Sequence, residues 1–439
     1  MHYCTLFAML TQSSRPISRS VAIAISSFLA LQLATELFQL AQYSSSDHGG
    51  SCTKEYESVC KAFEANFARG LERDGAHFAV YHKSKLKVNI WAGYADSESE
   101  RKWTPDTRTV LFSATKAISA LCVAVLVDRG FVSYNDPVVR FWPAYGANGK
   151  DRTTVEDILT HQAGLPFLEE PILIEHAKNV SQILRMIEQA KPLWEPGTAS
   201  GYHAITYGWL VDGLVRKVDP FGRDLRTFFR EEIAEPHGLD MDIGVEREEL
   251  HRMARMTQPG ILEYARDIIK DPRMLAMLAL MYVRPSDSYV WKVRDNTEWL
   301  PLNYDTVPFN DPEILQLSIG SASGVGNANN IAKLFSLALD GSLISNSTLK
   351  EISSPTLDTW HWEKVVIWPV SKGHGFFYDA HPVLGGKHVF GHPGYGCQTI
   401  HIDPDNDLTV AYVTNGLKTA TSELCQPYQR LLAEVYRSL

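Results

Sequence analysis

One long apolar segment constrains the fold of this chain more than any other feature. From Val110 to Gly130 almost every residue is apolar, and Asp128, Arg129 and Gly130 end the segment. A helix that is apolar on all sides must be surrounded by other elements, and a glycine after the last turn is a common helix stop. The segment therefore predicts a buried central helix around which the rest of the chain packs.

Short β-rich segments stand at both ends of the chain, with a helical region between them. The expected elements are a helix at 56–69, a hairpin at 76–92 with its turn at 83–85, helices broken by prolines at 136–310, strands at 389–402 and 408–413, and a last helix at 421–438. Strands at both ends of a helical middle predict one sheet assembled from both ends of the chain.

The start of the chain has the composition of a targeting segment. The first acidic residue is Glu36, and residues 20–35 form an uncharged, largely apolar run after Arg15 and Arg19. This pattern is typical of a signal peptide or signal anchor, although an acid-free start with arginine and serine also fits a mitochondrial presequence, and an amphipathic helix folded onto the body is a third interpretation. We expect membrane attachment through residues 20–42.

The predicted localisation is therefore membrane-anchored or in the secretory pathway, with the mitochondrion as the alternative. Two sequons, at Asn179 and Asn346, would be usable in the secretory lumen. Residues 43–54 are rich in serine and glycine and are expected to be a linker, so that residues 1–54 precede a folded body that begins near Glu55.

Charge and cysteine content narrow the function classes. With 42 Lys+Arg against 51 Asp+Glu, the net charge is −9, and because no long basic stripe is present a nucleic-acid partner is not expected. Six cysteines are too few for a disulfide scaffold. Cys52 and Cys60 lie close enough in sequence to bridge in an oxidising compartment or to stay reduced, and Cys122 is expected in the core. The predicted partner is a small-molecule or peptide substrate, and the oligomeric state stays open.

Ser113 and Lys116 are the first catalytic candidates. The S-x-x-K pattern alone carries no weight, because it also occurs at Ser51/Lys54, Ser58/Lys61, Ser84/Lys87, Ser99/Lys102 and Ser347/Lys350. Ser113 differs because it opens the buried helix, where a spacing of three residues puts Lys116 on the same face one turn later. Burial favours a neutral lysine that can accept the serine proton. The alternative is a helix-capping serine with a lysine that reaches solvent.

Two further segments could contribute to a site. A Pro/Gly turn at 194–198 delivers Tyr202 to the start of an apolar helix at 205–215, although a buried core tyrosine would fit the same pattern. The segment Gly391-His392-Pro393-Gly394-Tyr395-Gly396 has three glycines that let a ligand approach the backbone. It lacks the G-x-G-x-x-G order of a phosphate loop, so no cofactor is expected.

Taken together, these segments resemble the serine β-lactamase-like family, which includes class C β-lactamases, D-alanyl-D-alanine carboxypeptidases, family VIII esterases and the mitochondrial serine β-lactamase-like proteins of animals. The resemblance covers almost the whole body and is closest in style to the animal proteins. Four landmarks occur in the family's order and spacing, namely Leu111-Phe112-Ser113-Ala114-Thr115-Lys116, residues 157–166, Glu195-Pro196-Gly197-Thr198 with Tyr202 and Tyr207-Gly208, and Gly391-His392-Pro393-Gly394-Tyr395-Gly396.

The resemblance implies a fold and a division of the chain. The expected fold is β-lactamase/transpeptidase-like, an α/β (α+β) architecture with an antiparallel sheet flanked by helices and a mostly helical subdomain. The single domain would span 55–439, with its sheet part at about 55–125 and 315–439 and its helical part at about 126–314. The site would lie in the cleft between the two parts.

The resemblance also implies a serine hydrolase that forms an acyl-serine intermediate on an ester or amide. Ser113 would be the nucleophile, and Lys116 and Tyr202 would share the proton between serine and leaving group. The backbone N–H groups of Ser113 and Tyr395 would form the oxyanion hole. The segment 157–166 is expected to support the site rather than to take part in the chemistry.

This chain departs from the family pattern at positions that bind β-lactams. His392 stands where relatives have the third-motif lysine, and we expect it to act as a neutral imidazole because Lys116 is nearby. Pro393 removes a hydroxyl, and Ala204 replaces an asparagine of class C enzymes. Gly394 and Gly396 remain as substrate-binding positions. These departures argue against β-lactamase activity and favour an esterase or peptidase-like activity.

Two other classes of function compete with this interpretation. A metal hydrolase would need a ligand set, but the histidines at 374, 381, 388, 392 and 401 form neither H-E-x-x-H nor H-x-H-x-D, so no metal is expected. A non-catalytic scaffold or binding protein that keeps the fold is the main alternative. The aromatic residues Trp291, Trp299, Tyr304 and Phe309 suggest an apolar pocket, although ordinary core packing is the preferred interpretation.

Overall fold

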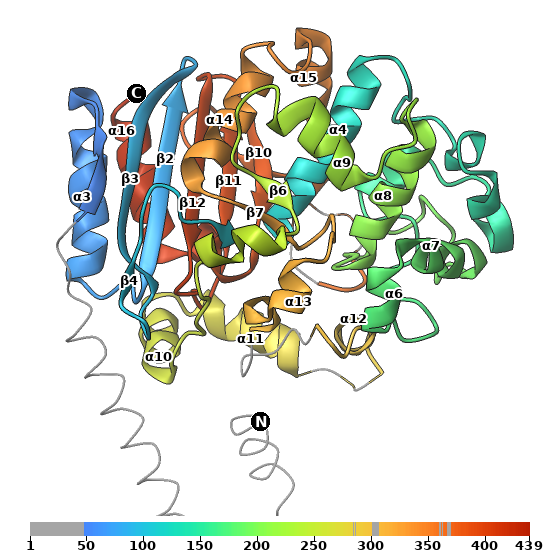
Figure 1. Cartoon of the computed structure of the whole chain (residues 1–439), viewed down its shortest axis with the longest axis horizontal. Helices are drawn as coiled ribbons and strands as arrows, with labels where there is room; N and C mark the ends of the chain where they lie inside the picture. Colours follow the sequence, from blue (N-terminus) through green and yellow to red (C-terminus); the bar gives the residue numbers. More distant parts are fainter. Residues whose placement is uncertain are drawn as a thin grey trace, which may run out of the picture.

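The central feature of the molecule is an antiparallel sheet built from both ends of the chain (Figure 1). The computed structural model describes residues 48–439, with gaps at 284, 286, 301–306, 360, 362 and 367–369. The strand order is β1-β3-β2-β12-β11-β10-β9-β8, with β4 paired to β3. The strands are β1 His48–Cys52, β2 Gly75–His82, β3 Lys85–Asp96, β4 Arg101–Lys102, β8 Ser371–Gly373, β9 Phe376–Ala380, β10 His388–Pro393, β11 Thr399–Asp403 and β12 Leu408–Thr414. The prediction of a two-ended sheet is confirmed.

Helices cover both faces of this sheet, which is why its central strands are apolar on both sides. In the described part of the chain, the α-helices are α3 Glu57–Ala68, α4 Thr115–Asp128, α5 Val155–Leu159, α6 Ile174–Lys178, α7 Val180–Gln189, α8 Thr206–Val218, α9 Leu225–Phe229, α10 Ile261–Lys270, α11 Arg273–Tyr282, α12 Tyr289–Asp295, α13 Pro312–Leu315, α14 Ala328–Leu339, α15 Asn346–Ile352 and α16 Gln426–Arg437. Phe78 and Val80 of β2 pack toward α3 and α16, whereas Ala79 between them belongs to the core on the other face. This alternation is the two-residue period of a strand.

The apolar segment at 110–130 contains the buried helix α4, as predicted. Every residue from Thr115 to Leu126 is buried, and Gly130 has a φ of 74° after the last turn.

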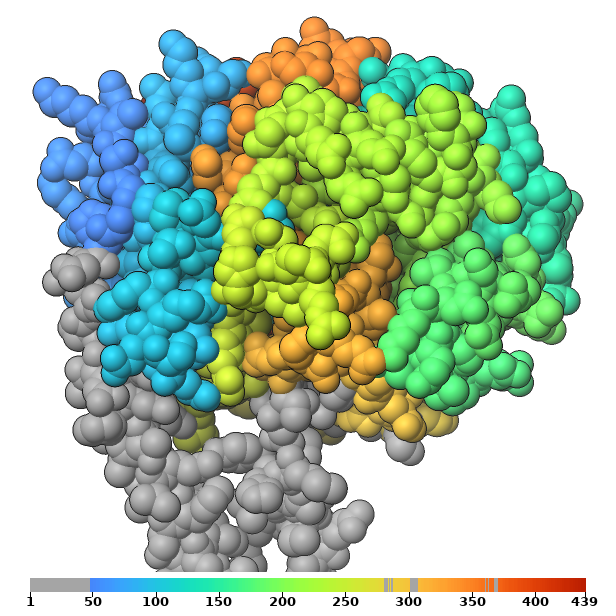
Figure 2. All heavy atoms as spheres, in the orientation of Figure 1, coloured from blue at the N-terminus to red at the C-terminus, as the bar shows by residue number. Residues whose placement is uncertain are grey.

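A second, small sheet joins α4 to the rest of the fold. Its strands β5 (Thr109–Val110), β7 (Gly324–Gly326) and β6 (Asp242–Ile243) pair in the order β5-β7-β6. Figure 2 shows that the segment near residue 250 lies across the front of the molecule, between the N-terminal strands and the helical region.

The expected linker at 43–54 is wrong for its second half. Residues His48–Cys52 form β1, an edge strand that pairs with β3 from Ala92 to Val88. The glycines belong to a strand here because Trp91 lies across them: a Cβ on Gly49 would come within 2.4 Å of the Trp91 indole. Gly50 also has a φ of 87°, which favours glycine. The Ser/Gly composition reflects close packing rather than a flexible connection.

The predicted targeting segment lies mostly outside the described residues, which begin at His48. Within the described part of the chain, no helix combines the length and the apolar character needed to cross a bilayer. Localisation and membrane attachment through residues 20–42 therefore stay predictions, as does the proposed division into sheet and helical parts.

Candidate active site

Ser113 lies in a tight turn immediately before α4. The 3-10 turn Phe112–Ala114 precedes the helix, and Phe112 has a φ of 46°, a left-handed conformation that is uncommon for a bulky residue. Contacts on both sides hold this turn: the Phe112 ring packs against Phe309 with 5.3 Å between centroids and against Tyr395 with 5.5 Å. The turn leaves Ser113 at the wall of a cavity while Phe112 and Ala114 are buried.

Lys116 is fully buried behind Ser113 and has three oxygen neighbours. Its Nζ lies 3.3 Å from Ser113 Oγ, 2.8 Å from the Ala204 carbonyl and 3.0 Å from the Ser321 carbonyl. Burial lowers the pKa of the Lys116 ammonium well below its ordinary value. A neutral amine has two N–H donors and one lone pair. Because the two carbonyls can only accept, they take the two N–H groups, and the lone pair is left for the Ser113 hydroxyl.

Tyr202 approaches the same two residues from the start of the α8 segment. Lys116 Nζ lies 4.8 Å from the centroid of the Tyr202 ring. Burial raises the pKa of the Tyr202 phenol, and a hydrogen bond with Ser113 only partly opposes this rise. Tyr202 is therefore a neutral hydroxyl that can accept a hydrogen bond at the serine, and it can relay a proton only by giving up its own as it receives another.

The landmark at 157–166 contacts Tyr202 and its backbone neighbours, in line with the expected supporting role. The His161 ring packs 4.8 Å from the Tyr202 ring, and the His161 carbonyl accepts the Gly201 N–H at 2.9 Å. His161 Nδ1 accepts the backbone N–H of His203 at 3.1 Å. Burial lowers the pKa of His161 well below its usual range, so the imidazole is neutral and serves as a fixed wall.

His392 on β10 faces the site as a buried, neutral imidazole. Its ring stacks on Phe377 with 4.2 Å between centroids, and its Nδ1–H donates to the Pro393 carbonyl at 2.7 Å. Burial lowers the pKa of His392 well below its ordinary value. The remaining nitrogen, Nε2, is buried without a hydrogen-bond partner. It therefore offers a lone pair to an incoming hydroxyl or N–H group.

The loop after β10 brings Tyr395 against the nucleophile turn. Gly394 packs so closely that a Cβ there would lie 2.2 Å from the Leu111 carbonyl oxygen, and Gly396 has a φ of 70° beside Leu417. A glycine is therefore required at both predicted substrate-binding positions. This close approach brings the backbone at 394–395 beside that at 113–114, where the predicted oxyanion donors belong.

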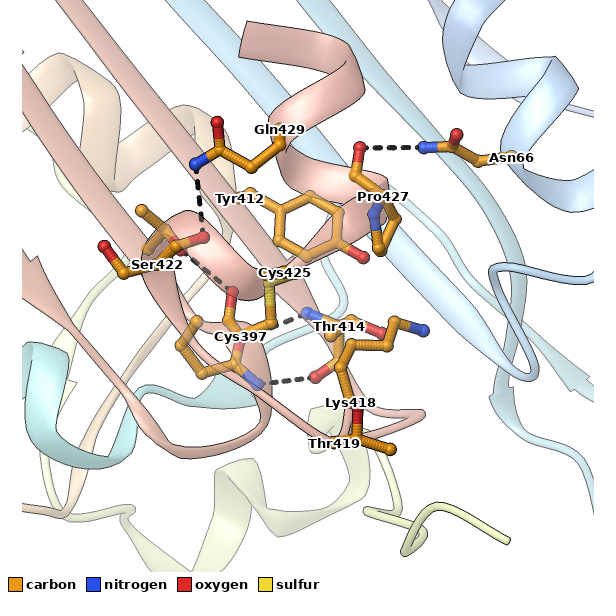
Figure 3. Close-up of a disulfide and its surroundings, with 12 residues drawn as sticks. Asn66, Cys397, Tyr412, Thr414, Lys418, Thr419, Ser422, Cys425, Pro427 and Gln429 are labelled. Carbon is orange, nitrogen blue, oxygen red and sulfur yellow. Dashed lines mark hydrogen bonds between the residues drawn. A yellow bond between two sulfur atoms is a disulfide. The ribbon is translucent and has the colours of Figure 1, made fainter. Parts of the chain in front are cut away.

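A disulfide holds this loop in place. Cys397 directly follows Gly396 and is bonded to Cys425 at the start of α16 (Figure 3). The Lys418 N–H donates to the Gly396 carbonyl at 3.1 Å. The sequence analysis did not anticipate this bridge, because 28 positions separate the two cysteines. The structure also pairs Cys52 with Cys60, the bond that the sequence left open, and leaves Cys122 free and buried.

The cavity in front of Ser113 has a volume of about 340 Å³ and a largely aliphatic wall. Its apolar lining residues are Met277, Val290, Val365, Val366, Val370, Phe377 and Leu424. Of the aromatic residues named in the sequence analysis, Trp291, Trp299 and Phe309 are not among its lining residues: Phe309 packs behind Phe112, and Trp299 donates to the Ile172 carbonyl. Tyr304 lies outside the described residues. The apolar character of the pocket was expected, but from the wrong residues.

A buried ion pair under Tyr202 escaped the sequence analysis. Lys372 donates to Glu363 and, at 2.9 Å, to Ser200. Glu363 Oε1 accepts backbone N–H groups from Tyr202, Val365 and Val366 at 2.8, 3.0 and 3.2 Å. Burial alone would raise the pKa of Glu363, but Lys372 and these donors hold it below its ordinary value. Lys372 lies on β8 and Glu363 on the loop before it, and neither segment has a sequence pattern that predicts an element or a contact between them.

The remaining histidines serve other contacts. His381 pairs with Asp403 at 2.9 Å and His374 lies 3.1 Å from Glu156. Among the residues that the structure describes, no three His, Cys, Asp or Glu side chains are placed to hold a metal ion.

Comparison with known proteins agrees with this geometry. Residues 63–434 match the family described as Beta-lactamase, and the chain belongs to this family of serine hydrolases. It is 30% identical over 381 residues to the esterase/beta-lactamase LipL of Mycobacterium tuberculosis, across 84% of this chain and 83% of LipL. The resemblance noted in the sequence is thereby confirmed.

Solved structures place the fold in the same family. A family VIII carboxylesterase superposes with a TM-score of 0.76 at 27% identity, over 90% of this chain and 100% of that chain. A penicillin-binding protein homologue from Caulobacter crescentus gives a TM-score of 0.72 at 32% identity, over 90% and 100%. The predicted fold class, an antiparallel sheet with many helices in a β-lactamase/transpeptidase-like arrangement, is confirmed.

Proposed function

We propose that this protein is a serine hydrolase that cleaves esters or amides through an acyl intermediate on Ser113. The observation that carries the proposal is Lys116: it is buried, and two backbone carbonyls occupy its N–H groups while its third neighbour is Ser113 Oγ, 3.3 Å away. A positioned base with a lowered pKa next to a hydroxyl is the arrangement that activates a serine nucleophile.

The chemical steps follow from these positions. Ser113 Oγ attacks the substrate carbonyl carbon as its proton passes to Lys116, and the oxygen of the tetrahedral intermediate accepts the backbone N–H groups of Ser113 and Tyr395. Tyr202 passes the proton to the leaving alcohol or amine, which departs and leaves an ester on Ser113. Water then attacks this ester with the same groups acting in reverse. His392 Nε2 accepts a hydrogen bond from substrate or from the Tyr202 hydroxyl.

We propose an ester with an apolar acyl group as the substrate, rather than a β-lactam. Valine, methionine and leucine side chains form much of the cavity wall, and its charged members include the acidic Asp379 and Glu423. The pKa of His392 is lowered by burial, so this histidine is no permanent cation for a substrate carboxylate. Lys372 and Lys418 line the cavity too, but they are paired with Glu363 and Glu72. The similar family VIII carboxylesterase supports an ester substrate, whereas the name of LipL covers both esterase and β-lactamase activity.

Labelling with a fluorophosphonate probe tests the proposal directly. The parent protein should be labelled, Ser113→Ala should not, and Lys116→Met should react at least about 10²-fold more slowly. Ser347→Ala is the matched control, since Ser347 belongs to another S-x-x-K pattern but is exposed on α15. A parent protein that resists the probe would instead favour a scaffold or binding protein. Rates for p-nitrophenyl esters of rising chain length, set against peptide amides and a chromogenic cephalosporin, then define the substrate.

A further inference from the structure

Helices α10 and α11 carry an exposed aliphatic surface, which we define as Ile269, Leu275 and Val283. Their side chains are 82%, 58% and 81% exposed. The sequence has no charged residue from Met274 to Val283, and among residues 273–279 of α11 only Met274 is buried. Soluble proteins rarely leave a long apolar helix facing water, so such a surface indicates a binding partner.

This surface is continuous with the cavity in front of Ser113. Met274 packs against Ala420 and Leu424, with Met277 beside them. Met277, Ala420 and Leu424 also line the cavity. One side of α11 thus faces the site while Leu275 points outward. An acyl chain that entered past this helix would stay in contact with apolar side chains from the surface to the nucleophile.

The composition of the surface fits lipid better than protein. Its exposed members are aliphatic, whereas protein interfaces are enriched in tyrosine, tryptophan and arginine. Lys270 follows directly after Ile269 and bonds only the neutral side chain of Gln426, at 2.8 Å, among the contacts described for it. Its side chain lies at the edge of the surface. Aliphatic side chains with a lysine at their rim are typical of segments that lie in a bilayer interface.

The N-terminal edge of the body lies at the same end of the sheet as α10. Arg73 pairs with Glu263 of α10, and Arg266 of α10 donates to the Gly70 carbonyl at 2.9 Å. His48, the first described residue, aligns with Ala92, which in turn aligns with Ala76, three residues after Arg73. The uncharged run at 20–35 precedes His48 by only 12 residues. A membrane segment there would hold this end of the body at the bilayer.

We propose that the α10–α11 surface rests on a lipid bilayer and admits membrane-borne acyl esters to the Ser113 cavity. The second part rests on the proposed function, whereas the first part does not. Each aliphatic side chain withdrawn from lipid lowers membrane partitioning roughly tenfold.

Photo-crosslinking in the full-length protein tests the contact itself. A diazirine-bearing amino acid is placed at position 275 or, as the control, at position 221, where Phe221 is 79% exposed between α8 and α9. With vesicles of phosphatidylcholine and phosphatidylserine, a lipid adduct is expected at 275 and not at 221. Absence of a lipid adduct at 275, equal adducts at both positions, or a crosslink from 275 to a second copy of the chain would overturn the proposal.

A kinetic experiment tests access to the site. The variant Ile269→Glu/Leu275→Glu should hydrolyse vesicle-embedded p-nitrophenyl palmitate at least about tenfold more slowly than the parent while hydrolysing soluble p-nitrophenyl acetate at the same rate. Phe221→Glu should change neither rate. If the double variant matches the parent on both esters, the access role is wrong. A lipid adduct at 275 in a parent protein that hydrolyses neither ester would retain the membrane contact and refute the proposed function.

Discussion

The Glu363–Lys372 pair makes a sharp prediction about stability. In Glu363→Gln, the amide oxygen can still accept the N–H groups of Tyr202, Val365 and Val366, so those contacts survive. The amide NH₂ faces the Lys372 ammonium, however, and Lys372 keeps only the Ser200 hydroxyl, at 2.9 Å. Breaking a buried pair by removing one partner costs about 3–5 kcal/mol. Unfolding a domain of about 385 residues carries an entropy of roughly 0.8 kcal/mol/K, at about 2.1 cal/mol/K per residue, so the melting temperature should fall by roughly 4–6 °C.

The pH dependence of this loss gives a second readout. Burial already lowers the pKa of Lys372, with Glu363 opposing the shift, so removal of the carboxylate lowers it further. Between this folded pKa and the unfolded value of about 10.4, the unfolded state binds more protons, so the stability of the variant rises with pH. The deficit relative to the parent should therefore shrink from pH 7 to pH 10.

Thermal unfolding of a small set of variants checks the reasoning. Glu363→Gln/Lys372→Met removes both charges and should recover most of the loss, because no buried ion stays unpaired. Glu57→Gln, which breaks an exposed pair with Lys61, should leave the melting temperature unchanged. A Glu363→Gln protein as stable as the parent at pH 7, or a double variant less stable than the single one, would refute the buried-pair argument.

Four further predictions concern the site and its surroundings. The kcat/KM for p-nitrophenyl acetate should rise with pH through the pKa of Lys116, which burial lowers, and reach a plateau; a rise that continued above pH ~10 would show an ordinary lysine. His392→Asn should cost about 10²-fold in kcat, while a His392→Lys protein as active as the parent from pH 5 to 9 would reduce the histidine to a spacer. In thermal unfolding, Cys425→Ser should lower stability by roughly 3–4 kcal/mol and Cys52→Ser by roughly 2–3 kcal/mol, because the two disulfides close loops of different length. Only Cys425→Ser should also lower kcat, since its partner Cys397 directly follows the Tyr395 loop. Equal kcat values for the two variants would show that this disulfide does not position the loop. Asn179 and Asn346 are both exposed, so Asn179→Gln and Asn346→Gln should each remove one glycosidase-sensitive mass step, and an insensitive, mitochondrially protected protein would contradict the secretory assignment.

The sequence predicted those parts of the fold that local patterns encode. Periodicity and stop signals predict the buried helix α4, the β2–β3 hairpin and α16, and the predicted ends lie within a few residues of the observed ones. By contrast, β1 was taken as linker, because a Gly/Ser stretch becomes a strand only when Trp91, some 40 positions later, lies over it. Strands β8 and β9 were missed because they are short and lie between segments without a clear period.

Local patterns likewise predicted some residues of the candidate site and missed others. Ser113, Lys116, Tyr202 and His392 were located because family landmarks surround them, and the structure brings all four to one place. The Glu363–Lys372 pair and the Cys397–Cys425 bond depend on contacts between segments whose proximity no local pattern reveals. The aliphatic pocket was likewise assigned to aromatic residues, because composition indicates which side chains are apolar but not which wall they form.

The antiparallel pairing of β2 with β12 also has a consequence for synthesis. Ala76 of β2 pairs with Thr414 of β12, so the strand made early must wait for one made near the end of the chain. At about 5–20 residues per second, the β2–β3 hairpin emerges from the ribosome roughly 20–70 s before its partner exists. Throughout that interval its hydrogen-bonding edge and its two apolar faces are unprotected. Newly made chains should therefore depend on chaperones, and a nascent chain stalled before residue 408 should have no hydrolase activity, since the strand that joins the two ends is still missing.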